Sequence, residues 1–255
     1  MRPTLLSVVV PAYNEREVVH RLVESVESAL KDSGPFELVV VDDGSTDGTR
    51  EELLRLSASH PNLRVVALDC HHGQTCGTAA GIRAARGDVV VTIDADMQNP
   101  PTEIPKLLDA LDHADAVVGY RVKRNDSGVR RLSSRIANGI RNSITRETIR
   151  DTGCSLKAFR TEHIREVALF EGMHRFLPTL LKMQGRTVLE IPVEHRPREA
   201  GQSKYGVWNR VFRSFLDCLA VRWMQWRVLR YSCSDVTPAR RNGSIEASGN
   251  VHDHD

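Results

Sequence analysis

Residues 89–101 read VVVTIDADMQNPP, a run of mostly β-branched residues that ends in two aspartates. Such an unbroken apolar run is typical of a strand that is buried on both faces. Asp94 and Asp96 follow this run, and Gln98 comes two positions later. Neighbouring carboxylates repel each other unless a positive charge lies close to them. The stretch is therefore either a polar turn, which aspartate and asparagine favour, or a site for a divalent cation.

Runs of the same kind alternate with helical patterns in the first half of the chain. Strands are expected at residues 5–10, 36–41, 63–68, 88–93 and 115–120. Helices are expected at residues 15–34, 49–60, 77–87 and 104–114. This alternation predicts an α/β fold, with a mostly parallel sheet and helices on both of its faces. In such sheets, ligands bind beyond the carboxyl ends of the strands.

The bulk composition is that of an ordinary soluble globular protein. The 255 residues carry a formal net charge of +2 and suffice for one core with a tail. The five cysteines form no CxxC pair, and their spacing suggests neither a disulfide framework nor a zinc site. We therefore expect a reducing, cytosolic setting. The first apolar run is too short for a signal peptide, and no stretch reaches the roughly 18 apolar residues of a membrane span.

Three of the expected strands end in unusual polar sequences, PAYNE (11–15), DDGSTDGT (42–49) and DADMQ (94–98). A single acidic strand end would mean little, because aspartate and serine are good helix N-caps. Three such ends at one edge of a sheet would repel one another, unless they bind a metal and a nucleotide. The chain contains neither the GxGxxG motif of dinucleotide-binding enzymes nor the GxxxxGK[ST] motif of P-loop NTPases.

PAYNE, VVVDDGSTDGT and IDADMQNPP, in this order and spacing, resemble family 2 glycosyltransferases with the GT-A (nucleotide-diphospho-sugar transferase) fold. Within that family, the chain is similar to the dolichol-phosphate mannosyltransferase group and its bacterial polyprenyl-phosphate relatives. The resemblance extends from about residue 5 to residue 230. It continues in GYR (119–121), RRLSSRIAN (130–138), DTGCSLKAFR (151–160) and RPREAGQSKYG (196–206).

The resemblance assigns a metal site to the DADMQ segment. It implies that Asp96 and Gln98 bind Mg²⁺ or Mn²⁺, hard cations that prefer oxygen ligands and neutralise a leaving diphosphate. Asp94, at the end of the strand, is expected to reach the ribose or the sugar. Asp94 and Asp96 are therefore candidate catalytic residues.

The resemblance also implies a donor pocket. The residues expected to contact the nucleotide sugar are Pro11, Tyr13, Glu15, Val41, Asp43, Asp94 and Ala95. Core packing is the alternative for Tyr13 and Val41, and a turn cap is the alternative for Asp43. Arg198 and Lys204, on a glycine-containing loop, are expected to bind the donor's diphosphate and to close over it. Such a closure would exclude water that hydrolyses the donor.

Residues 121–150 are strongly basic, with nine arginines and lysines against two acidic residues. The resemblance implies that Arg121 and Arg131 bind the phosphate of a polyprenyl-phosphate acceptor, a role that suits the guanidinium fork. The remaining arginines are expected at the surface. A solvated charged helix is one alternative for the segment. Nucleic-acid binding is another, but no recognition motif accompanies the charge.

Asp151 is the third candidate catalytic residue. An acceptor phosphomonoester has a second pKa near 6 and is already a dianion at neutral pH. The nucleophile therefore needs no base, and we expect Asp151 to orient the sugar or the acceptor. Cys154 is interpreted as a small buried residue and not as a nucleophile.

Residues 207–231 are predicted to form a C-terminal amphipathic helix, with Phe215, Leu219 and Trp223 on one stripe and arginines beside it. The helix either packs on the catalytic domain or lies at a membrane interface, where each arginine gains about 1 kcal/mol from anionic lipid. The catalytic domain is expected at residues 1–206, and a disordered polar tail at 232–255. That tail favours peripheral attachment, or a membrane-anchored partner, on the cytoplasmic membrane face.

The sequence thus predicts inverting, metal-dependent transfer of one sugar from a GDP- or UDP-linked donor to a dolichyl or undecaprenyl phosphate. Processive family 2 synthases carry QxxRW, whereas this chain has LAVRW, so transfer of a single sugar is favoured. A soluble or saccharide acceptor is the alternative within enzymes. A non-catalytic sugar-nucleotide-binding scaffold is the other alternative, although a scaffold has no need of metal ligands.

Overall fold

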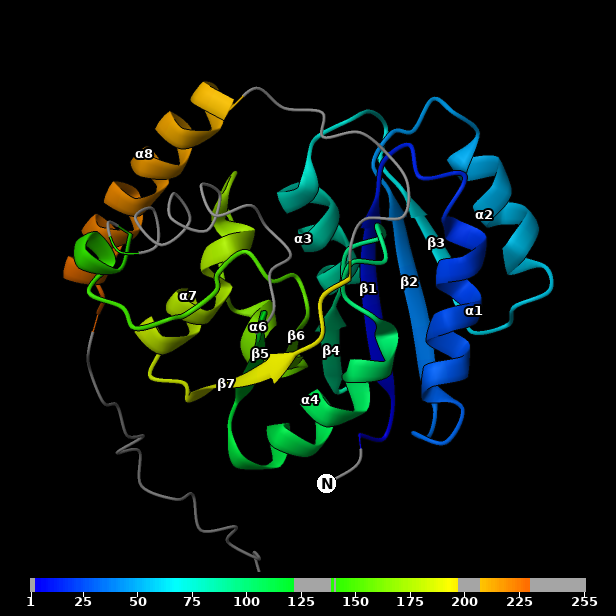
Figure 1. Ribbon diagram of the computed structural model, residues 1–255, viewed down its shortest axis with the longest axis horizontal. Coiled ribbons are helices and arrows are strands. Elements are labelled where there is room, and N and C mark those ends of the chain that lie inside the picture. Colours follow the sequence, from blue (N-terminus) through cyan, green and yellow to red (C-terminus); the bar gives the residue numbers. More distant parts are fainter. Residues whose placement is uncertain (1–2, 122–138, 140, 197–206, 230–255) are drawn as a thin grey trace, which may run out of the picture.

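A computed structural model describes residues 3–121, 139, 141–196 and 207–229 (Figure 1). Within these ranges the chain forms a seven-stranded sheet with the strand order β3-β2-β1-β4-β6-β5-β7. The strands are β1 (Leu6–Ala12), β2 (Phe36–Asp42), β3 (Leu63–Ala67), β4 (Val89–Thr92), β5 (Ala116–Arg121), β6 (Lys157–Arg160) and β7 (Val188–Val193). Strand β6 is antiparallel to its neighbours β4 and β5, and the other pairings are parallel. The predicted mostly parallel sheet is confirmed.

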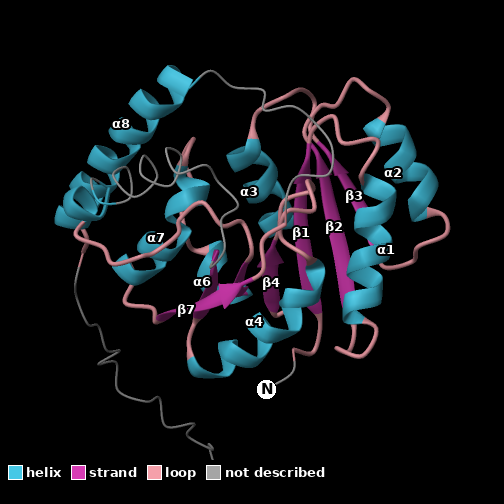
Figure 2. Cartoon of the chain, viewed as in Figure 1, coloured by secondary structure: helices cyan, strands magenta, loops and turns pink. Residues whose placement is uncertain are grey.

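Helices cover both faces of the sheet, as the alternation predicted (Figure 2). One face carries α1 (Val19–Leu30), α2 (Thr49–Ser57) and α4 (Ile104–Ala110), and the other carries α3 (Gln74–Ala84), α6 (Thr161–Arg165) and α7 (Leu177–Met183). Short 3₁₀ helices are η1 (Pro101–Glu103), η2 (Leu111–His113) and η3 (Met173–Phe176). Successive strand residues point to opposite faces. Val8 and Val10 therefore lie in the core beneath α1, and Val9 lies in the core beneath α3.

Helix α3 packs directly on β1 through its small residues. A Cβ atom added at Gly77 would lie 2.9 Å from Pro11 Cβ, and one added at Gly81 would overlap the side chain of Val9. Any side chain at these positions would push the helix away from the sheet. The close approach brings the first turn of α3 to the carboxyl edge of the sheet, where Gln74 bonds Asp94.

Strand β6 forms the end of the DTGCSLKAFR segment (151–160), and its antiparallel direction was not predicted. Because it runs backwards, its first residues lie at the edge where β4 and β5 end. The Gly119 N–H donates to the Leu156 carbonyl over 3.0 Å, and the Thr92 hydroxyl donates to the Ser155 carbonyl over 2.8 Å. Residues 151–156 thereby join the same edge as the DADMQ segment.

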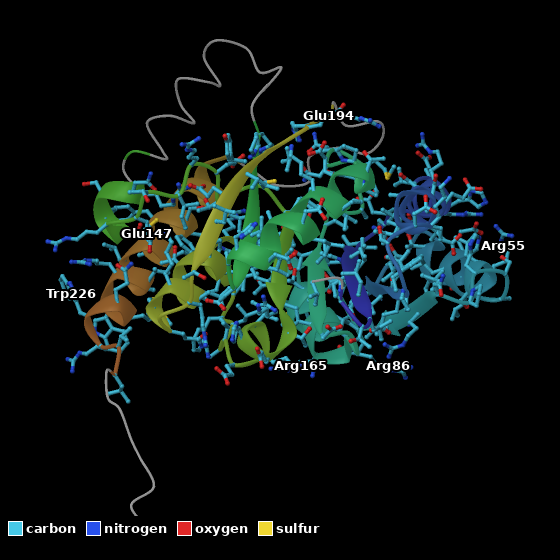
Figure 3. The ribbon with its side chains drawn as sticks, turned by 90° about the horizontal axis from the view of Figure 1, so that it is seen from below. Arg55, Arg86, Glu147, Arg165, Glu194 and Trp226 are labelled. Carbon is cyan, nitrogen blue, oxygen red and sulfur yellow. The ribbon has the colours of Figure 1, made fainter. Side chains whose placement is uncertain are left out.

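The last described helix, α8 (Val207–Trp226), packs on η3 and α7 through a narrow face. Cys218 and Val221 are buried in a small core with residues that include Phe176. The stripe of Phe215, Leu219 and Trp223 points outward instead, and these side chains are 44%, 44% and 58% exposed. Figure 3 places Trp226 at the outer end of the molecule. None of the helices in the described ranges is long and apolar enough to cross a membrane.

Candidate active site

The turns that follow β1 and β2 are bonded to each other. Asn14 has a left-handed φ of 54°, a conformation that asparagine tolerates. Its backbone N–H donates to Ser45 Oγ over 2.9 Å, and its Oδ1 accepts from the Thr46 N–H over 2.8 Å. The Glu15 N–H donates to Thr49 Oγ1 over 2.9 Å. The predicted donor residue Glu15 is therefore carried on a turn that the turn after β2 holds in place.

Asp43 directly follows β2 and is buried. Its two carboxylate oxygens accept from the backbone N–H groups of His72 and Gly73, each over 2.8 Å. Nδ1 of His71 lies 2.9 Å from Asp43 Oδ2, and the His71 ring stacks on Tyr13 with the ring centroids 3.7 Å apart. Asp43 thus anchors the loop after β3, a role close to the turn cap considered as its alternative. That loop places an imidazole against the predicted donor residue Tyr13.

Three other predicted donor residues are positioned by the sheet. Val41 and Ala95 are buried in hydrophobic cores on opposite faces of the sheet. The core-packing alternative therefore describes the side chain of Val41. Pro11 of β1 lies in register with Val41 of β2. Any contact that Val41 or Ala95 makes with a ligand would come chiefly from its backbone at the sheet edge.

The DADMQ segment forms a strained turn directly beyond β4. Met97 has a φ of 59°, which costs free energy in a residue that has a Cβ atom. The Gln98 N–H donates to Asp96 Oδ1 over 3.2 Å, which joins the two predicted metal ligands across the turn. The Gln98 carbonyl accepts from the Arg196 N–H over 2.8 Å, just beyond β7. The turn thus holds a carboxylate and an amide at neighbouring positions.

Asp94 lies where β4, α3 and the start of β6 meet. Its Oδ1 accepts from Gln74 Nε2 over 2.7 Å, and its backbone N–H donates to Ser155 Oγ over 3.1 Å. Burial and, next, the charge of Asp96 raise the pKa of Asp94 from 3.8 to about 6. Two carboxylates in this arrangement are stabilised by a cation between or beside them. The residues present therefore fit a divalent metal.

A buried lysine stands beside these carboxylates. Lys157, the first residue of β6, is buried, and burial lowers the pKa of its ammonium group, while the thiol of Cys154 and the carboxylate of Asp94 act in the opposite direction. Its Nζ donates to the His174 carbonyl over 3.5 Å, and His174 Nδ1 lies 2.7 Å from Thr75 Oγ1 at the start of α3. The sequence analysis missed Lys157 and His174. It also missed His71, because the segment after the third strand was not among the three strand ends selected.

Arg121, at the end of β5, forms a fork-shaped ion pair with Asp151. Its Nε lies 2.6 Å from Asp151 Oδ2, and its Nη2 lies 2.8 Å from Asp151 Oδ1. The two side chains are 16% and 8% exposed. The Gly153 N–H adds a bond of 3.1 Å to Asp151 Oδ1. The predicted acceptor-phosphate ligand and the predicted orienting carboxylate are therefore brought together, as direct partners.

The expectation of a surface position is wrong for Arg141. This residue is buried and donates to Thr152 Oγ1 and, over 2.8 Å, to the Ile149 carbonyl. Its guanidinium holds the loop that carries Asp151, because those buried acceptors need donors. Cys154 is fully buried, and burial raises the pKa of its thiol to about 11. Its interpretation as a buried residue is confirmed, and a buried thiol with a raised pKa is poorly suited to act as a nucleophile.

Three of the predicted site residues lie outside the described residues. They are the acceptor-phosphate residue Arg131 and the donor-diphosphate residues Arg198 and Lys204. The structure brings the other predicted residues to one edge of the sheet, at the ends of β1, β2, β4 and β5 and just before the start of β6.

Comparison with known proteins identifies the family. The sequence profile described as Glycosyl transferase family 2 matches residues 7–168, more than half of the chain. The chain belongs to glycosyl transferase family 2. The predicted family is therefore confirmed, and the matched region contains the DADMQ turn, Arg121 and Asp151.

Curated relatives of this family 2 member are polyprenyl-phosphate sugar transferases by name. It is 42% identical over 210 residues to undecaprenyl-phosphate 4-deoxy-4-formamido-L-arabinose transferase of Edwardsiella ictaluri, covering 81% of this chain and 64% of the relative. It is 41% identical over 224 residues to dodecaprenyl-phosphate galacturonate synthase of Rhizobium johnstonii, covering 85% of this chain and 66% of the relative. The chain thus spans slightly less than two thirds of these relatives.

Solved structures support the fold. The glucosyl-3-phosphoglycerate synthase of Mycobacterium tuberculosis, solved with Mn²⁺, UDP and glucosyl-3-phosphoglycerate, has a TM-score of 0.65 at 20% identity, covering 89% of this chain and 81% of that one. The mannosyl-3-phosphoglycerate synthase of Rubrobacter xylanophilus has a TM-score of 0.65 at 17% identity, and the match covers 92% of this chain and 79% of that one. These neighbours are GT-A glycosyltransferases, so the predicted GT-A fold is confirmed.

Proposed function

We propose that this chain transfers one sugar from a GDP- or UDP-linked donor to a dolichyl or undecaprenyl phosphate, with inversion at the anomeric carbon. Relatives about 40% identical to the chain, whose names specify undecaprenyl and dodecaprenyl phosphate, support the acceptor class. The activity, the substrates and the partners all belong to the proposal, because the chain spans only part of those relatives.

The observation that chiefly carries the proposal is the arrangement at the ends of β4 and β5. Asp94 and Asp96 follow β4, and Arg121 ends β5, while β6 lies between these strands. Carboxylates suited to a metal and a sugar therefore lie at the same sheet edge as a guanidinium suited to a phosphate. Transfer to a phosphate needs both kinds of group at one site.

Asp96 and Gln98 are the residues that would hold Mg²⁺ or Mn²⁺. The bound ion would neutralise the charge of the departing nucleoside diphosphate. The fit rests on the raised pKa of Asp94 beside Asp96, which marks a place where a positive charge is stabilising. A structural neighbour solved with Mn²⁺ and UDP, and another solved with Mg²⁺ and UDP, agree with a metal of this kind.

The acceptor's phosphate oxygen attacks the anomeric carbon while the bond from that carbon to the diphosphate oxygen breaks. The phosphomonoester is largely a dianion at neutral pH, so no residue needs to remove a proton from it. Asp151 is bonded by two guanidinium nitrogens of Arg121, which makes it poorly suited to act as a base. Its role in this proposal is to orient Arg121 toward the acceptor. Arg131 is proposed as the second phosphate ligand.

The donor is proposed to lie along the ends of β1, β2 and β4. Tyr13 and Asp43 would meet the nucleotide, and Asp94 would meet the ribose or sugar. Arg198 and Lys204 are proposed to bind the diphosphate. The bond from the Arg196 N–H to the Gln98 carbonyl supports this, because it places the chain just before those residues beside the proposed metal turn.

The outward face of α8 is proposed to lie on the cytoplasmic face of a membrane. Trp223 and Trp226 are 58% and 70% exposed, and Arg222 and Arg227 lie over their rings at 4.9 and 5.8 Å from the centroids of Trp226 and Trp223. Exposed indoles flanked by arginines suit the boundary between anionic headgroups and acyl chains. A peripheral position of this kind would give the site access to a lipid acceptor.

The direct test is transfer of radiolabelled sugar from a panel of GDP- and UDP-sugars into organic-extractable polyprenyl phosphate. Label that appears in the organic phase with one donor, and is released by mild acid as the free sugar, supports the proposal. Label that reaches only water-soluble products would assign a soluble or saccharide acceptor. Donor binding without any transfer in either phase would favour a non-catalytic scaffold.

A further inference from the structure

The loop between β3 and α3 brings three different metal-ligand side chains together. Nε2 of His72 lies 2.7 Å from Asp69 Oδ1 and 3.3 Å from Cys70 Sγ. The three ligand atoms all lie within 4.8 Å of one another, and all three residues are exposed. Across the residues that the structure describes, this is the one group of three histidine, cysteine and acidic side chains that converges in this way.

We propose that Asp69, Cys70 and His72 form a zinc-binding site with a fourth position open to water. A thiolate, an imidazole and a carboxylate are the ligands that Zn²⁺ takes in proteins, usually with tetrahedral geometry. The thiolate makes the set a poor match for Mg²⁺ or Mn²⁺, which prefer oxygen ligands. The site is therefore chemically distinct from the oxygen ligands Asp96 and Gln98.

The distances between the ligand atoms fit this geometry after a small movement. In a tetrahedral zinc site, bond lengths of about 2.0–2.3 Å place the ligand atoms about 3.3–3.6 Å apart. The Cys70–His72 distance of 3.3 Å already lies at this spacing. The Asp69–His72 distance of 2.7 Å is that of a hydrogen bond and must open by roughly 0.6 Å. The side chain of Asp69 is 84% exposed, so nothing around it opposes that movement.

The backbone of the loop is held in place by buried neighbours. The carboxylate of Asp43 bonds the backbone N–H groups of His72 and Gly73. A Cβ atom at Gly44 would overlap the backbone of Cys70, so the loop lies directly against the turn after β2. The ligand-bearing residues are therefore presented by an ordered backbone, which lowers the entropy cost of binding.

Cysteine spacing alone predicted no zinc site, because the usual signals need pairs of cysteines or histidines at fixed intervals. Here each ligand is of a different type, and a single loop of four residues supplies all three. Binding requires the thiolate and an unprotonated Nε2, so Zn²⁺ displaces the thiol proton into solvent and the neutral His72 ring carries its proton on Nδ1.

The experiment uses Co²⁺ as a spectroscopic substitute for Zn²⁺, because a Co²⁺–thiolate bond gives a strong near-ultraviolet charge-transfer band. The full chain is titrated with Co²⁺ and then with Zn²⁺. We expect the band in the wild type, its loss on adding Zn²⁺, and its persistence in excess Mg²⁺. Cys70→Ser should abolish the band, and His72→Ala should weaken Co²⁺ binding by at least about tenfold.

Two cysteine variants are matched controls. Cys76→Ser removes another exposed thiol, on α3. Cys233→Ser removes the cysteine of the C-terminal segment. Both should keep the band. His252 and His254 near the C-terminus could also bind metal, so the number of bound ions does not test the proposal. The deciding result is the loss of the charge-transfer band in Cys70→Ser. Absence of the band in the wild type, or its survival in a folded Cys70→Ser variant with an unchanged Tm, overturns the proposal.

Discussion

The guanidinium of Arg121 is held by two hydrogen bonds, of 2.6 and 2.8 Å, to the carboxylate of Asp151. The two residues lie thirty positions apart in the sequence, at the end of β5 and in the loop before β6. Arg121 was predicted to bind the phosphate of the acceptor, and Asp151 to orient the sugar or the acceptor. Because two guanidinium nitrogens bond both carboxylate oxygens, the proposed acceptor side of the site contains the two residues as one ion pair.

Removing both members of this pair is expected to destabilise the fold by less than the sum of the two single removals. Asp151→Ala or Arg121→Ala leaves a largely buried charge without its partner, which costs about 3–5 kcal/mol. The double variant removes both charges, so its loss should be clearly smaller than the sum of the single losses. Urea unfolding of the wild type, the two single variants and the double variant gives the coupling free energy of this double-mutant cycle.

The pair Arg55 and Glu52 on α2 is the matched control. It has the same fork geometry, with bonds of 3.0 and 2.6 Å, but Arg55 is 63% exposed. The same cycle on this pair should give little or no coupling, because solvent screens exposed charges. Equal coupling in the two cycles would show that burial does not strengthen the Arg121–Asp151 pair.

Asp94→Asn is expected to stabilise the metal-free protein at neutral pH. The pKa of Asp94 is raised from 3.8 to about 6, so above pH 6 the folded state carries a charge that burial and Asp96 disfavour. The wild type therefore loses stability as pH rises from about 4 to 6, and the asparagine variant does not share this loss. Tm measured in a chelator should be higher for the variant at pH 7, and the difference should shrink toward pH 4.

Asp109→Asn, at an exposed position of α4, is the control for this prediction and should leave Tm unchanged at both pH values. Added Mg²⁺ or Mn²⁺ should raise the Tm of the wild type more than that of Asp94→Asn, because the ion also relieves the repulsion between Asp94 and Asp96. A variant less stable than the wild type at pH 7 would show that the bond from Gln74 to the Asp94 carboxylate outweighs the repulsion.

The strands of the first half of the chain could be predicted from the sequence because they are buried on both faces. Val39, Val40 and Val41 have no exposed surface, and such strands form continuous apolar runs. Strand β7 could not be predicted in this way. It is an edge strand that contains Glu190 and Pro192, and Val193 alone among its residues is buried. Its sequence therefore lacks the apolar run.

The candidate site also has a part that the sequence predicts and a part that it does not. Asp94, Asp96 and Gln98 were predictable because they follow one strand within five residues. The pairing of Arg121 with Asp151 depends on β6 running antiparallel, which places a distant loop beside the end of β5. The buried cation Lys157 was equally hidden, since a lysine in a sequence carries no sign of its burial.

Asp96→Ala is expected to abolish sugar transfer and to weaken donor binding chiefly when Mg²⁺ or Mn²⁺ is present. The proposed metal turn loses its carboxylate, while Gln98 alone supplies one neutral oxygen. Isothermal titration with the nucleotide sugar, with and without metal, measures the effect. Full wild-type activity in a chelator would remove the metal from the proposal, and Asp109→Ala serves as the control.

Arg131→Ala is expected to raise the KM for the lipid phosphate far more than the KM for the nucleotide sugar. The residue belongs to the basic segment that follows β5, away from the proposed donor residues. Arg135→Ala, from the same segment, should change both constants little. Steady-state kinetics with each substrate varied in turn separates the two effects, and equal increases in both KM values would reassign Arg131 to the donor or to folding.

The final prediction concerns the two faces of α8. If the outward stripe lies on a membrane, the wild type should sediment with anionic liposomes, and raised salt should release it. Salt acts because it screens the attraction between arginine and lipid over a Debye length of about 8–10 Å. Replacing Phe215 and Trp223 by Ser should abolish sedimentation with little change in Tm, because both side chains are substantially exposed.

Two controls separate membrane binding from stability. Val221→Ser changes the buried face of the same helix and should lower Tm, because it places a hydroxyl in an apolar core and leaves unfilled space. Leu54→Ser changes an exposed apolar residue on α2, 56% exposed, and should alter neither Tm nor sedimentation. Tryptophan emission should also shift to shorter wavelengths on adding vesicles, as Trp223 and Trp226 leave water. Two results together would contradict the membrane role: no sedimentation of the wild type with anionic liposomes, and a large loss of Tm in the Phe215 and Trp223 variant. They would assign the outward stripe to packing within the protein.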